Sequence, residues 1–239
     1  MAEDKFAIHA AARDGKVSVI ESLLNANPKL ALRKDDDGRL PIHWACSYNR
    51  KEVVELLVNQ KGFDPDVEDE MGWTPFMIAA SVKESDAIID LLLSRGADIN
   101  QTNNQNQTAL HFIASKNNID LARKLLSPDL IKPAKPASVR VKDKRGQYPL
   151  HRAAAIGSVP MINLLLEHKS PLNATDSAGY TPLHHAVAEG HGDAAVALLK
   201  AGAETDKKDV DGCLALDLAP DKDVRRFIER EAEREGIEL

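Results

Sequence analysis

A six-residue phrase recurs along this chain and limits how it can fold. Its best copy reads Thr181-Pro182-Leu183-His184-His185-Ala186. Degraded copies begin at Phe6, Leu40, Thr74, Thr108, Tyr148 and Leu214, so successive copies start 33 to 40 residues apart. Such a period is typical of repeat proteins, in which each unit buries its apolar face against its neighbours and not in one central core. We therefore expect an array of about seven units.

The best copy shows how each unit is built. Thr181 can cap a helix that begins at Pro182, because the N–H that proline lacks would have no partner there. Gly190 ends this short helix, and a second helix with an apolar stripe follows. The predicted core positions on the second helices are Val17, Val19, Ile20, Leu23 and Leu24; Val53, Val54, Leu56 and Leu57; Ile88, Ile89, Leu91, Leu92 and Leu93; Ile119, Leu121, Leu125 and Leu126; Met161, Ile162, Leu164, Leu165 and Leu166; and Ala194, Ala195, Val196, Leu198 and Leu199.

The phrase and its period resemble the ankyrin repeat. The resemblance implies an all-α solenoid of about seven helix-turn-helix repeats with hairpin-like fingers, forming one domain over residues 1–239. The predicted repeats are about 1–37, 38–71, 72–105, 106–145, 146–178, 179–211 and 212–239. The last copy has Asp217 in place of histidine and passes into a charged tail, 229–235, which we expect to fray.

One interval is longer than the others, through the segment 127–138. Its three prolines exclude regular helix, and insertions in repeat arrays map to loops, so we expect a surface loop and not a domain boundary.

Composition narrows the function classes. The net charge of −6 argues against a nucleic-acid partner, because such proteins concentrate Lys and Arg on one face. Cys46 and Cys213 show no metal-ligand spacing, which suits a reducing compartment. Residues 1–5 lack a signal core and no stretch is long and apolar enough for a membrane span, so we expect a soluble intracellular protein with no membrane partner.

The recurring histidines invite a metal or catalytic interpretation. They occupy one equivalent site in successive repeats, however, so a single ion could not bridge them, and in ankyrin repeats this imidazole bonds to the Thr of its own motif and to the finger backbone. The one local cluster contains His184, His185 and His191. His184 is a motif histidine, and His191 stands beside the turn at Gly190. No nucleophile, base and orienting group assemble and no phosphate loop is present, so we expect neither an enzyme nor a cofactor.

Function is then expected on the fingers and first helices. The residue after each turn glycine or its equivalent includes Trp73 and Tyr180, and large aromatic side chains on exposed tips are favoured interface anchors. The alternative is that they lie flat against the next finger. Charge on the fingers is polarised, from Asp35–Asp37 and Glu68–Glu70 early in the chain to Lys142, Lys144 and Arg145 later. A partner with the opposite gradient would explain this pattern, and chance is the alternative.

Longer phrases are more specific. Four runs of sequence closely resemble the gankyrin family: residues 34–47, Gly72-Trp73-Thr74-Pro75-Phe76, residues 150–155 and residues 188–196. The resemblance as a whole extends over about residues 6–228. The resemblance implies a monomeric, cytoplasmic and nuclear chaperone for proteasome assembly, which grips the C-terminal domain of one regulatory-particle ATPase subunit. Family contacts would carry over to Asp37, Arg39, Asp69, Glu70, Trp73, Lys116, Lys144, Arg145 and Arg152; with Asp36, Trp44 and Tyr180 these residues form the candidate binding set.

One motif departs from the family. Animal gankyrin carries a Leu-x-Cys-x-Glu retinoblastoma-binding motif near the sixth repeat, where this chain has His185-Ala186-Val187-Ala188-Glu189. Retinoblastoma binding is therefore not expected. Two other functions stay open, an ankyrin inhibitor of an enzyme such as a cyclin-dependent kinase, and a plain adaptor.

Overall fold

The computed structural model describes residues 6–129, 131 and 134–239. Residues 1–5, on which part of the expectation about a signal sequence depends, and three residues of the predicted loop, Leu130, Lys132 and Pro133, lie outside the described part. The described residues form two compact units. Unit 1 takes the chain up to Asn104 together with Ser127–Ala137, and unit 2 takes Gln105–Leu126 and Ser138–Leu239.

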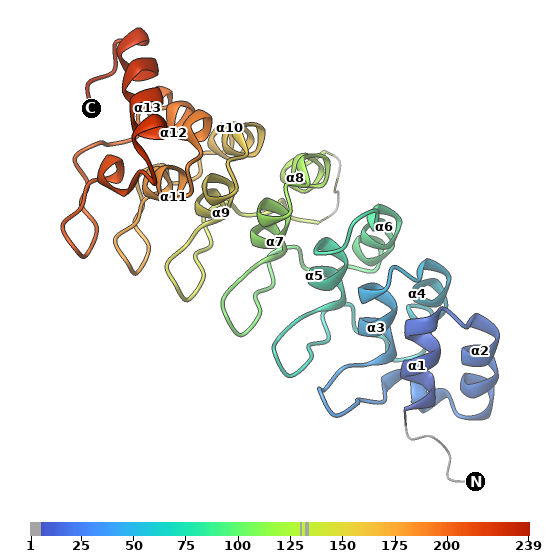
Figure 1. Cartoon of the computed structure of the whole chain (residues 1–239). Coiled ribbons are helices and arrows are strands. Elements are labelled where there is room, and N and C mark those ends of the chain that lie inside the picture. The colour runs from blue at the N-terminus through green and yellow to red at the C-terminus, as the bar shows by residue number, and fades with distance from the viewer. Residues whose placement is uncertain (1–5, 130, 132–133) are drawn as a thin grey trace. The chain divides into compact units, whose positions relative to one another are not determined.

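Unit 1 contains paired antiparallel helices. The first helices of the pairs are α1 (Ala7–Asp14), α3 (Pro41–Ser47) and α5 (Pro75–Ala80), and the second are α2 (Val17–Ala26), α4 (Lys51–Leu57) and α6 (Asp86–Ser94). A short 3-10 helix, η1 (Pro28–Leu32), follows α2. The first helices pack on one another in chain order, the second helices form a parallel row, and the fingers extend from the row of first helices (Figure 1).

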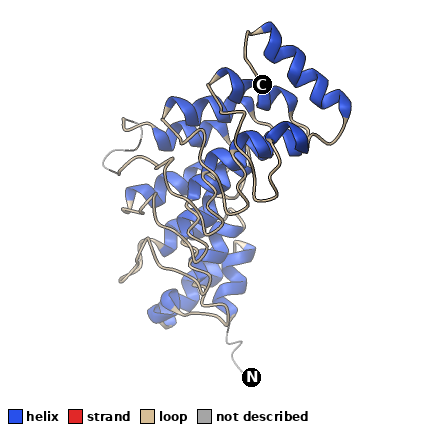
Figure 2. Ribbon diagram, turned by 90° about the vertical axis from the view of Figure 1, so that its left-hand side faces the viewer, coloured by secondary structure: helices blue, strands red, loops and turns tan. Residues whose placement is uncertain are grey.

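Unit 2 repeats this plan. Its first helices are α7 (Ala109–Ser115), α9 (Pro149–Ala155) and α11 (Pro182–Ala188), followed by a 3-10 helix, η2 (Ala215–Leu218). Its second helices are α8 (Ile119–Leu126), α10 (Val159–Glu167), α12 (Gly192–Lys200) and α13 (Lys222–Arg234). Figure 2 shows helices and loops and no strand in the described residues, which confirms the predicted all-α repeat fold.

The helix starts follow the predicted capping chemistry. Thr74 precedes Pro75, and its hydroxyl accepts the backbone N–H of Met77 at 3.2 Å. Where Leu40 or Tyr148 stands in place of threonine, the histidine three residues later takes over part of the capping. His43 Nδ1 accepts the N–H of Leu40 at 3.0 Å, and His151 Nδ1 accepts that of Tyr148 at 3.1 Å. The N-terminus of these helices is therefore satisfied with or without threonine.

The cores of the two units are the predicted apolar stripes. Ile20, Ile88 and Ile89 in unit 1 and Leu121 and Leu165 in unit 2 are almost completely buried. The prediction that Val19 belongs to the core is wrong, because this residue is 42% exposed. It precedes buried Ile20 by one residue on α2, and a step of about 100° per residue turns it toward solvent.

The C-terminal segment corrects a second prediction. The charged tail is helical to Arg234 and is not frayed. Asp221 caps α13 by accepting the N–H groups of Asp223 and Val224 at 2.9 and 2.8 Å, and Ile228 and Ala232, one turn apart, are buried. A buried apolar pair, a capped start and ion pairs along the helix, such as Arg234 with Glu231 at 3.0 Å, therefore order the charged tail.

The proline-rich segment contains no helix in its described residues, as predicted. Its backbone is anchored within unit 1, because Asn100 Nδ2 donates to the carbonyl of Pro136 at 2.9 Å, and Ile131 and Ala137 are buried. The segment is therefore packed more closely than a simple surface loop. The division of the chain into seven repeats with the boundaries given above stays a prediction.

Candidate functional site

Five fingers are organised by an aspartate at their first turn position. In each, one carboxylate oxygen (Oδ1) accepts the backbone N–H groups two and four residues later, at 2.8 to 3.0 Å. This is the hydrogen-bonded turn for which aspartate is favoured. These finger aspartates are Asp35, Asp69, Asp143, Asp176 and Asp209.

Neighbouring fingers within each unit touch through their backbones. The N–H of Glu70 donates to the carbonyl of Asp37 at 3.1 Å in unit 1, and that of Ser177 donates to Arg145 at 2.8 Å in unit 2. A Cβ on Gly72, where φ is 75°, would lie 2.7 Å from the backbone nitrogen of Asn104, so the turn requires glycine both for its left-handed backbone and for the space. The finger tips of each unit are thus held in a fixed register.

The second oxygen (Oδ2) of three finger aspartates binds a side chain of a first helix. The partner in each case stands nine residues later, and its nitrogen lies 2.7 to 2.9 Å from the oxygen. Trp44 Nε1 donates to Asp35, an Arg152 guanidinium nitrogen to Asp143, and His185 Nε2 bonds to Asp176. Finger and first helix are therefore joined at the position where both face the same surface.

These bonds control the ionisation of the carboxylates. Burial alone would raise the pKa of Asp35, but hydrogen bonds from Trp44 and from the backbone of Arg39 and Asp37 outweigh it and lower the pKa below its usual value. At Asp176 burial is likewise outweighed, by bonds from Gln147, His185 and the backbone, and the pKa is lowered. Both carboxylates are charged at neutral pH and already hydrogen-bonded.

Arg39 and Asp69, both in the predicted binding set, are bonded to each other. Arg39 Nε donates to Asp69 Oδ2 at 3.0 Å, and the side chains are 29% and 2% exposed, respectively. Whether either contacts a partner stays a prediction. Asp69 is a turn-forming carboxylate with no surface of its own. Gln147 makes the equivalent contact in unit 2, donating to Asp176 at 2.8 Å. The residue after the turn glycine thus reaches the next finger.

Arg152, also in the predicted binding set, is likewise engaged in an ion pair. Its side chain is about one quarter exposed and pairs with the buried Asp143 at 2.7 Å. One nitrogen of this guanidinium, Nε, is buried and has no hydrogen-bond partner among the described residues. Arg152 therefore offers a partner only part of its guanidinium.

The two aromatic candidates are less exposed than predicted. Trp73 and Tyr180 are both half-buried and do not stand on exposed tips. Tyr180 stacks on His184 with ring centroids 5.5 Å apart and meets His185 edge to face at 5.4 Å. Its ring therefore packs on its own first helix.

Trp44 belongs to a small aromatic cluster on α3. Its ring stacks on Tyr48 at 6.3 Å, and the guanidinium carbon of Arg39 lies 5.4 Å from its centroid. Tyr48 is 47% exposed. Tyr48, which did not stand out in the sequence, therefore adds an exposed ring to this cluster.

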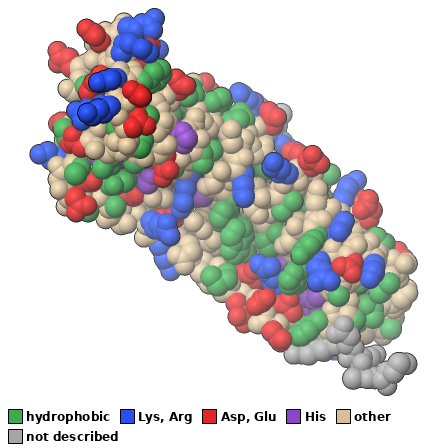
Figure 3. Space-filling view, viewed as in Figure 1, with side chains coloured by type: hydrophobic (Ala, Val, Ile, Leu, Met, Phe, Trp, Pro, Cys, Tyr) green, Lys and Arg blue, Asp and Glu red, His purple; other side chains and the backbone are tan. Residues whose placement is uncertain are grey.

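The remaining candidates are exposed charges. In unit 1, Asp36, Asp37 and Glu70 lie on the tips, and in unit 2, Lys144 and Arg145 lie on a tip and Lys116 follows α7. Figure 3 shows acidic side chains gathered over the first fingers of unit 1 and basic ones over fingers of unit 2. Lys144, Arg145 and Arg152 line a cavity of about 220 Å³ with Asp143, so the structure brings these three together. Lys116 and Tyr180 are not part of it.

The predicted structural bonds are present at most motif histidines, but Nε2 of His184 is buried and has no hydrogen-bond partner among the described residues. Nε2 of His43, His111 and His151 lies 3.1 Å from a finger carbonyl, and Nδ1 of His111 and His184 lies 3.0 and 2.8 Å from the threonine of its own motif. Burial lowers the pKa of His111 and His151 to about 4, so both rings are neutral. In the described part of the chain no group of three or more His, Cys, Asp or Glu side chains is placed to hold a metal ion.

Sequence reasoning placed Asp69, Trp44 and Arg152 in the binding set but missed the turn-forming role of the finger aspartates and the bond between His185 and Asp176. A signal was present, because an Asp stands four residues before the residue that follows each turn glycine. What could not be seen was which oxygen would remain for a side chain nine residues later.

No helix in the described residues has the length and apolar character to cross a membrane.

The family follows from comparison with known proteins. Ankyrin repeats, in three model copies, match residues 2–69, 59–135 and 127–209. The chain is 40% identical over 93% of its length, and 96% of the relative, to the probable 26S proteasome regulatory subunit p28 of Saccharomyces cerevisiae. The chain belongs to the gankyrin family. A second fungal relative, the ankyrin repeat-containing protein C6C3.08 of Schizosaccharomyces pombe, is 37% identical over 88% of each chain.

Solved structures agree with the fold of this gankyrin-family chain. The ankyrin repeat domain of Bcl-3 aligns with a TM-score of 0.71 at 24% identity, over 93% of this chain and 97% of that domain. That of human ASB11 aligns with a TM-score of 0.75 at 20% identity, over 94% and 97%. At these identities the likeness shows the ankyrin fold alone, and family membership depends on the fungal relatives.

Proposed function

We propose that this chain is an assembly chaperone of the proteasome regulatory particle and that it grips the C-terminal domain of one ATPase subunit through its fingers and first helices. The observation that carries the proposal is the identity of 40%, spread over 93% of the chain, to the proteasome regulatory subunit of Saccharomyces cerevisiae. The matched region extends over both units. The ankyrin repeats that match along the chain fit a protein-interaction scaffold and not an enzyme.

The geometry supports a refined binding set. The exposed charges are Asp36, Asp37 and Glu70 in unit 1 and Lys116, Lys144 and Arg145 in unit 2. All except Lys116, which follows α7, stand on fingers that hydrogen-bond to a neighbouring finger of their unit. Trp44, Trp73 and Tyr180, each half-buried, add aromatic surface. Arg39, Asp69 and Arg152 act mainly by fixing this surface, since each is engaged in an ion pair.

The proposal includes the setting of the protein. The chain is expected to be monomeric on its own, to work in the cytoplasm and nucleus, and to bind neither nucleic acid nor membrane. It requires no cofactor. Retinoblastoma binding is not part of the proposal, because His185 and Val187 stand where the animal motif has Leu and Cys.

Affinity purification from an extract of the host cell tests the proposal against its alternatives. We expect to recover regulatory-particle ATPase subunits without the proteolytic core particle, because a chaperone leaves before the particle matures. Recovery of a kinase with no proteasomal ATPase would contradict the proposal and support an inhibitor. Recovery of intact proteasomes would contradict the chaperone role while keeping the proteasome as partner.

A further inference from the structure

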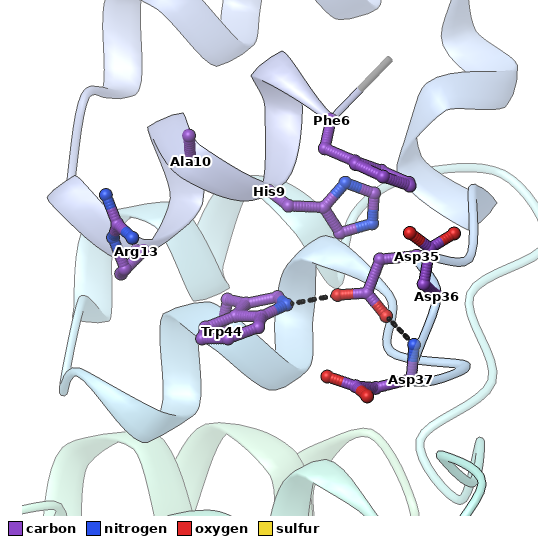
Figure 4. A pocket seen from close by; sticks show the side chains of 8 residues that line it. All are labelled: Phe6, His9, Ala10, Arg13, Asp35, Asp36, Asp37 and Trp44. Carbon is purple, nitrogen blue, oxygen red and sulfur yellow. Dashed lines mark hydrogen bonds between the residues drawn. The ribbon is translucent and has the colours of Figure 1, made fainter. Parts of the chain in front are cut away.

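Each finger with a turn aspartate carries one exposed residue at its tip, directly after that aspartate. Figure 4 shows the arrangement in the first finger, where the Asp35 carboxylate accepts the backbone N–H of Asp37 at 3.0 Å and Asp36 stands between them. In chain order this tip position holds Asp36, Glu70, Lys144, Ser177 and Val210. Ser177 is the one among them whose charge can be changed by covalent modification of a hydroxyl group.

The hydroxyl group of Ser177 is accessible. Ser177 is exposed, and among the described residues no hydrogen bond ends on its side chain. Other serine hydroxyls are in use, since those of Ser81, Ser94 and Ser115 each donate to a backbone carbonyl three or four residues earlier, at 2.6 to 3.0 Å. Modification of the Ser177 hydroxyl therefore breaks no hydrogen bond of the side chain.

The neighbouring finger places positive charge beside Ser177. The N–H of Ser177 donates to the carbonyl of Arg145 at 2.8 Å, and a Cβ added to Gly146 would lie 3.3 Å from the Ser177 nitrogen. Arg145 and the preceding residue, Lys144, are both exposed. Exposed charges interact over about 8 Å at physiological salt, and a residue bonded through its backbone to Arg145 lies inside that distance. A negative charge on Ser177 therefore acts directly on this basic finger.

The acidic groups near Ser177 do not cancel this effect. Asp176, the preceding residue, has a side chain only 4% exposed, and its Oδ2 is already bonded to two side chains at 2.8 and 2.9 Å. The next finger, which carries exposed Asp211, bonds to the backbone of Ala178 and not to that of Ser177. Within the tip of its finger, Ser177 thus stands on the side of the basic neighbour.

We propose that Ser177 is a phosphorylation site and that its phosphate pairs with Arg145 and Lys144, which removes the positive charge of their finger from the surface offered to the partner. A protein kinase transfers the γ-phosphoryl group of ATP: the Oγ–P bond forms, the bond to ADP breaks, and the hydroxyl proton passes to the catalytic base of the kinase. A phosphate adds a charge of about −1.5 to −2 at neutral pH, which matches the two cations. The regulatory consequence, but not the site itself, rests on the proposed function.

The fold already accepts a negative charge at this position. Glu70 stands directly after the turn aspartate of its own finger, and its N–H donates to a carbonyl of the preceding finger at 3.1 Å, as the N–H of Ser177 does. Both side chains are exposed. Phosphorylation of Ser177 therefore changes the charge of the recognition surface without disturbing the turn that holds it.

The contact with the basic finger is tested first without a partner. The full chain is made with phosphoserine in place of Ser177, and the second ionisation of the phosphate is followed by ³¹P NMR. We expect its pKa to fall from the usual value of about 6 to about 5.5 or lower, because adjacent cations stabilise the dianion. Lys144→Gln combined with Arg145→Gln should restore a pKa of about 6, whereas Arg123→Gln, on an exposed residue of α8, should change nothing. Equal pKa values in the three chains would overturn the proposed pairing.

Modification in the cell is tested by mass spectrometry. The chain is purified from an extract of the host cell with phosphatase inhibitors and divided into a fraction bound to proteasomal ATPase subunits and a free fraction. We expect phosphate on Ser177 in the free fraction and about three- to tenfold less in the bound fraction, because the modification weakens recognition. Ser177→Ala should abolish this phosphopeptide. Absence of phosphate from Ser177 in both fractions, or equal occupancy of the two, would overturn the proposal.

Association with the isolated ATPase C-terminal domain distinguishes this inference from the proposed function. At low salt, phosphoserine in place of Ser177 should slow association by about three- to tenfold, whereas phosphoserine in place of exposed Ser18 on α2 should not. If the domain binds the modified and unmodified chains alike, the regulatory inference is wrong while the proposed function stands. If the domain does not bind the unmodified chain, the proposed function fails, and the ³¹P titration and the phosphopeptide measurement decide whether Ser177 is a modified site.

Discussion

At the scale of single residues, carboxylates that look alike in the sequence have opposite roles. Asp69 is buried and its two oxygens receive the N–H groups of Met71 and Trp73 and the guanidinium of Arg39. Glu70, the next residue, is exposed. Position within the turn, and not residue type, decides which acid builds the finger and which is left for a partner.

This difference can be measured. Asp69→Ala should lower the free energy of unfolding by about 1 to 3 kcal/mol, because it leaves backbone donors and a half-buried guanidinium without an acceptor. Glu70→Ala, the matched control on an exposed position, should change it by less than about 0.5 kcal/mol. Chemical denaturation of both variants tests the assignment, and equal stabilities would contradict the structural role of Asp69.

The buried histidines predict a loss of stability in mild acid. Burial lowers the pKa of His111 and His151 to about 4 in the folded chain, against about 6.5 when unfolded. Between these values the unfolded chain binds protons that the folded chain does not, so stability is complete above pH 6.5 and falls as the pH drops toward 4. By pH 5 the loss should be about 1 to 2 kcal/mol for each histidine.

Denaturation series between pH 7.5 and 5 check this prediction. His111→Met, which copies Met77 at the equivalent position, should lower stability at pH 7.5 but flatten its dependence on pH. His168→Met, on an exposed histidine, is the control and should leave the slope unchanged. A wild-type chain equally stable at pH 7.5 and pH 5 would show that these rings are not held neutral by burial.

At the scale of helices, the sequence predicted well which segments are helical and which helix faces are buried, but it predicted poorly where the helices end. Periodic apolar stripes and Thr-Pro starts located the helix pairs, because burial of one face dominates their stability. The predictions for Val19 and for the tail after Ile228 were wrong. The step of about 100° per residue along α2 turns Val19 toward solvent beside buried Ile20, and the tail is ordered by the cap at Asp221 and the burial of Ala232.

The core assignment of the second helices gives a direct prediction. Leu165 on α10 is completely buried, and Leu165→Ala should cost about 2 to 5 kcal/mol. Asn163→Ala on the exposed side of the same helix should cost far less. Comparison of the two denaturation midpoints separates loss of packing from a change in helix propensity; identical midpoints would remove α10 from the core.

At the scale of the whole molecule, the sequence predicted the family and the charge difference between the early and late fingers, but not which charges are available. Three of the twelve candidates, Arg39, Asp69 and Arg152, are engaged in ion pairs within their own unit. Their partners lie 30 and 9 residues away in the sequence, so the pairs appear only when finger and helix are packed. The exposed charges that remain, acidic in unit 1 and basic in unit 2, carry the proposed recognition.

The most direct test of that recognition is the kinetics of binding between the full chain and an isolated ATPase C-terminal domain, measured at several salt concentrations. The account predicts that association slows as salt rises and that reversing Lys144 and Arg145 to Glu slows it further and flattens the salt dependence, because exposed charges mainly steer encounter. The fold should be unaffected, since both side chains are exposed. Association that ignores salt and the reversal, in a complex weakened by changes on the solvent side of the second helices, would contradict the account.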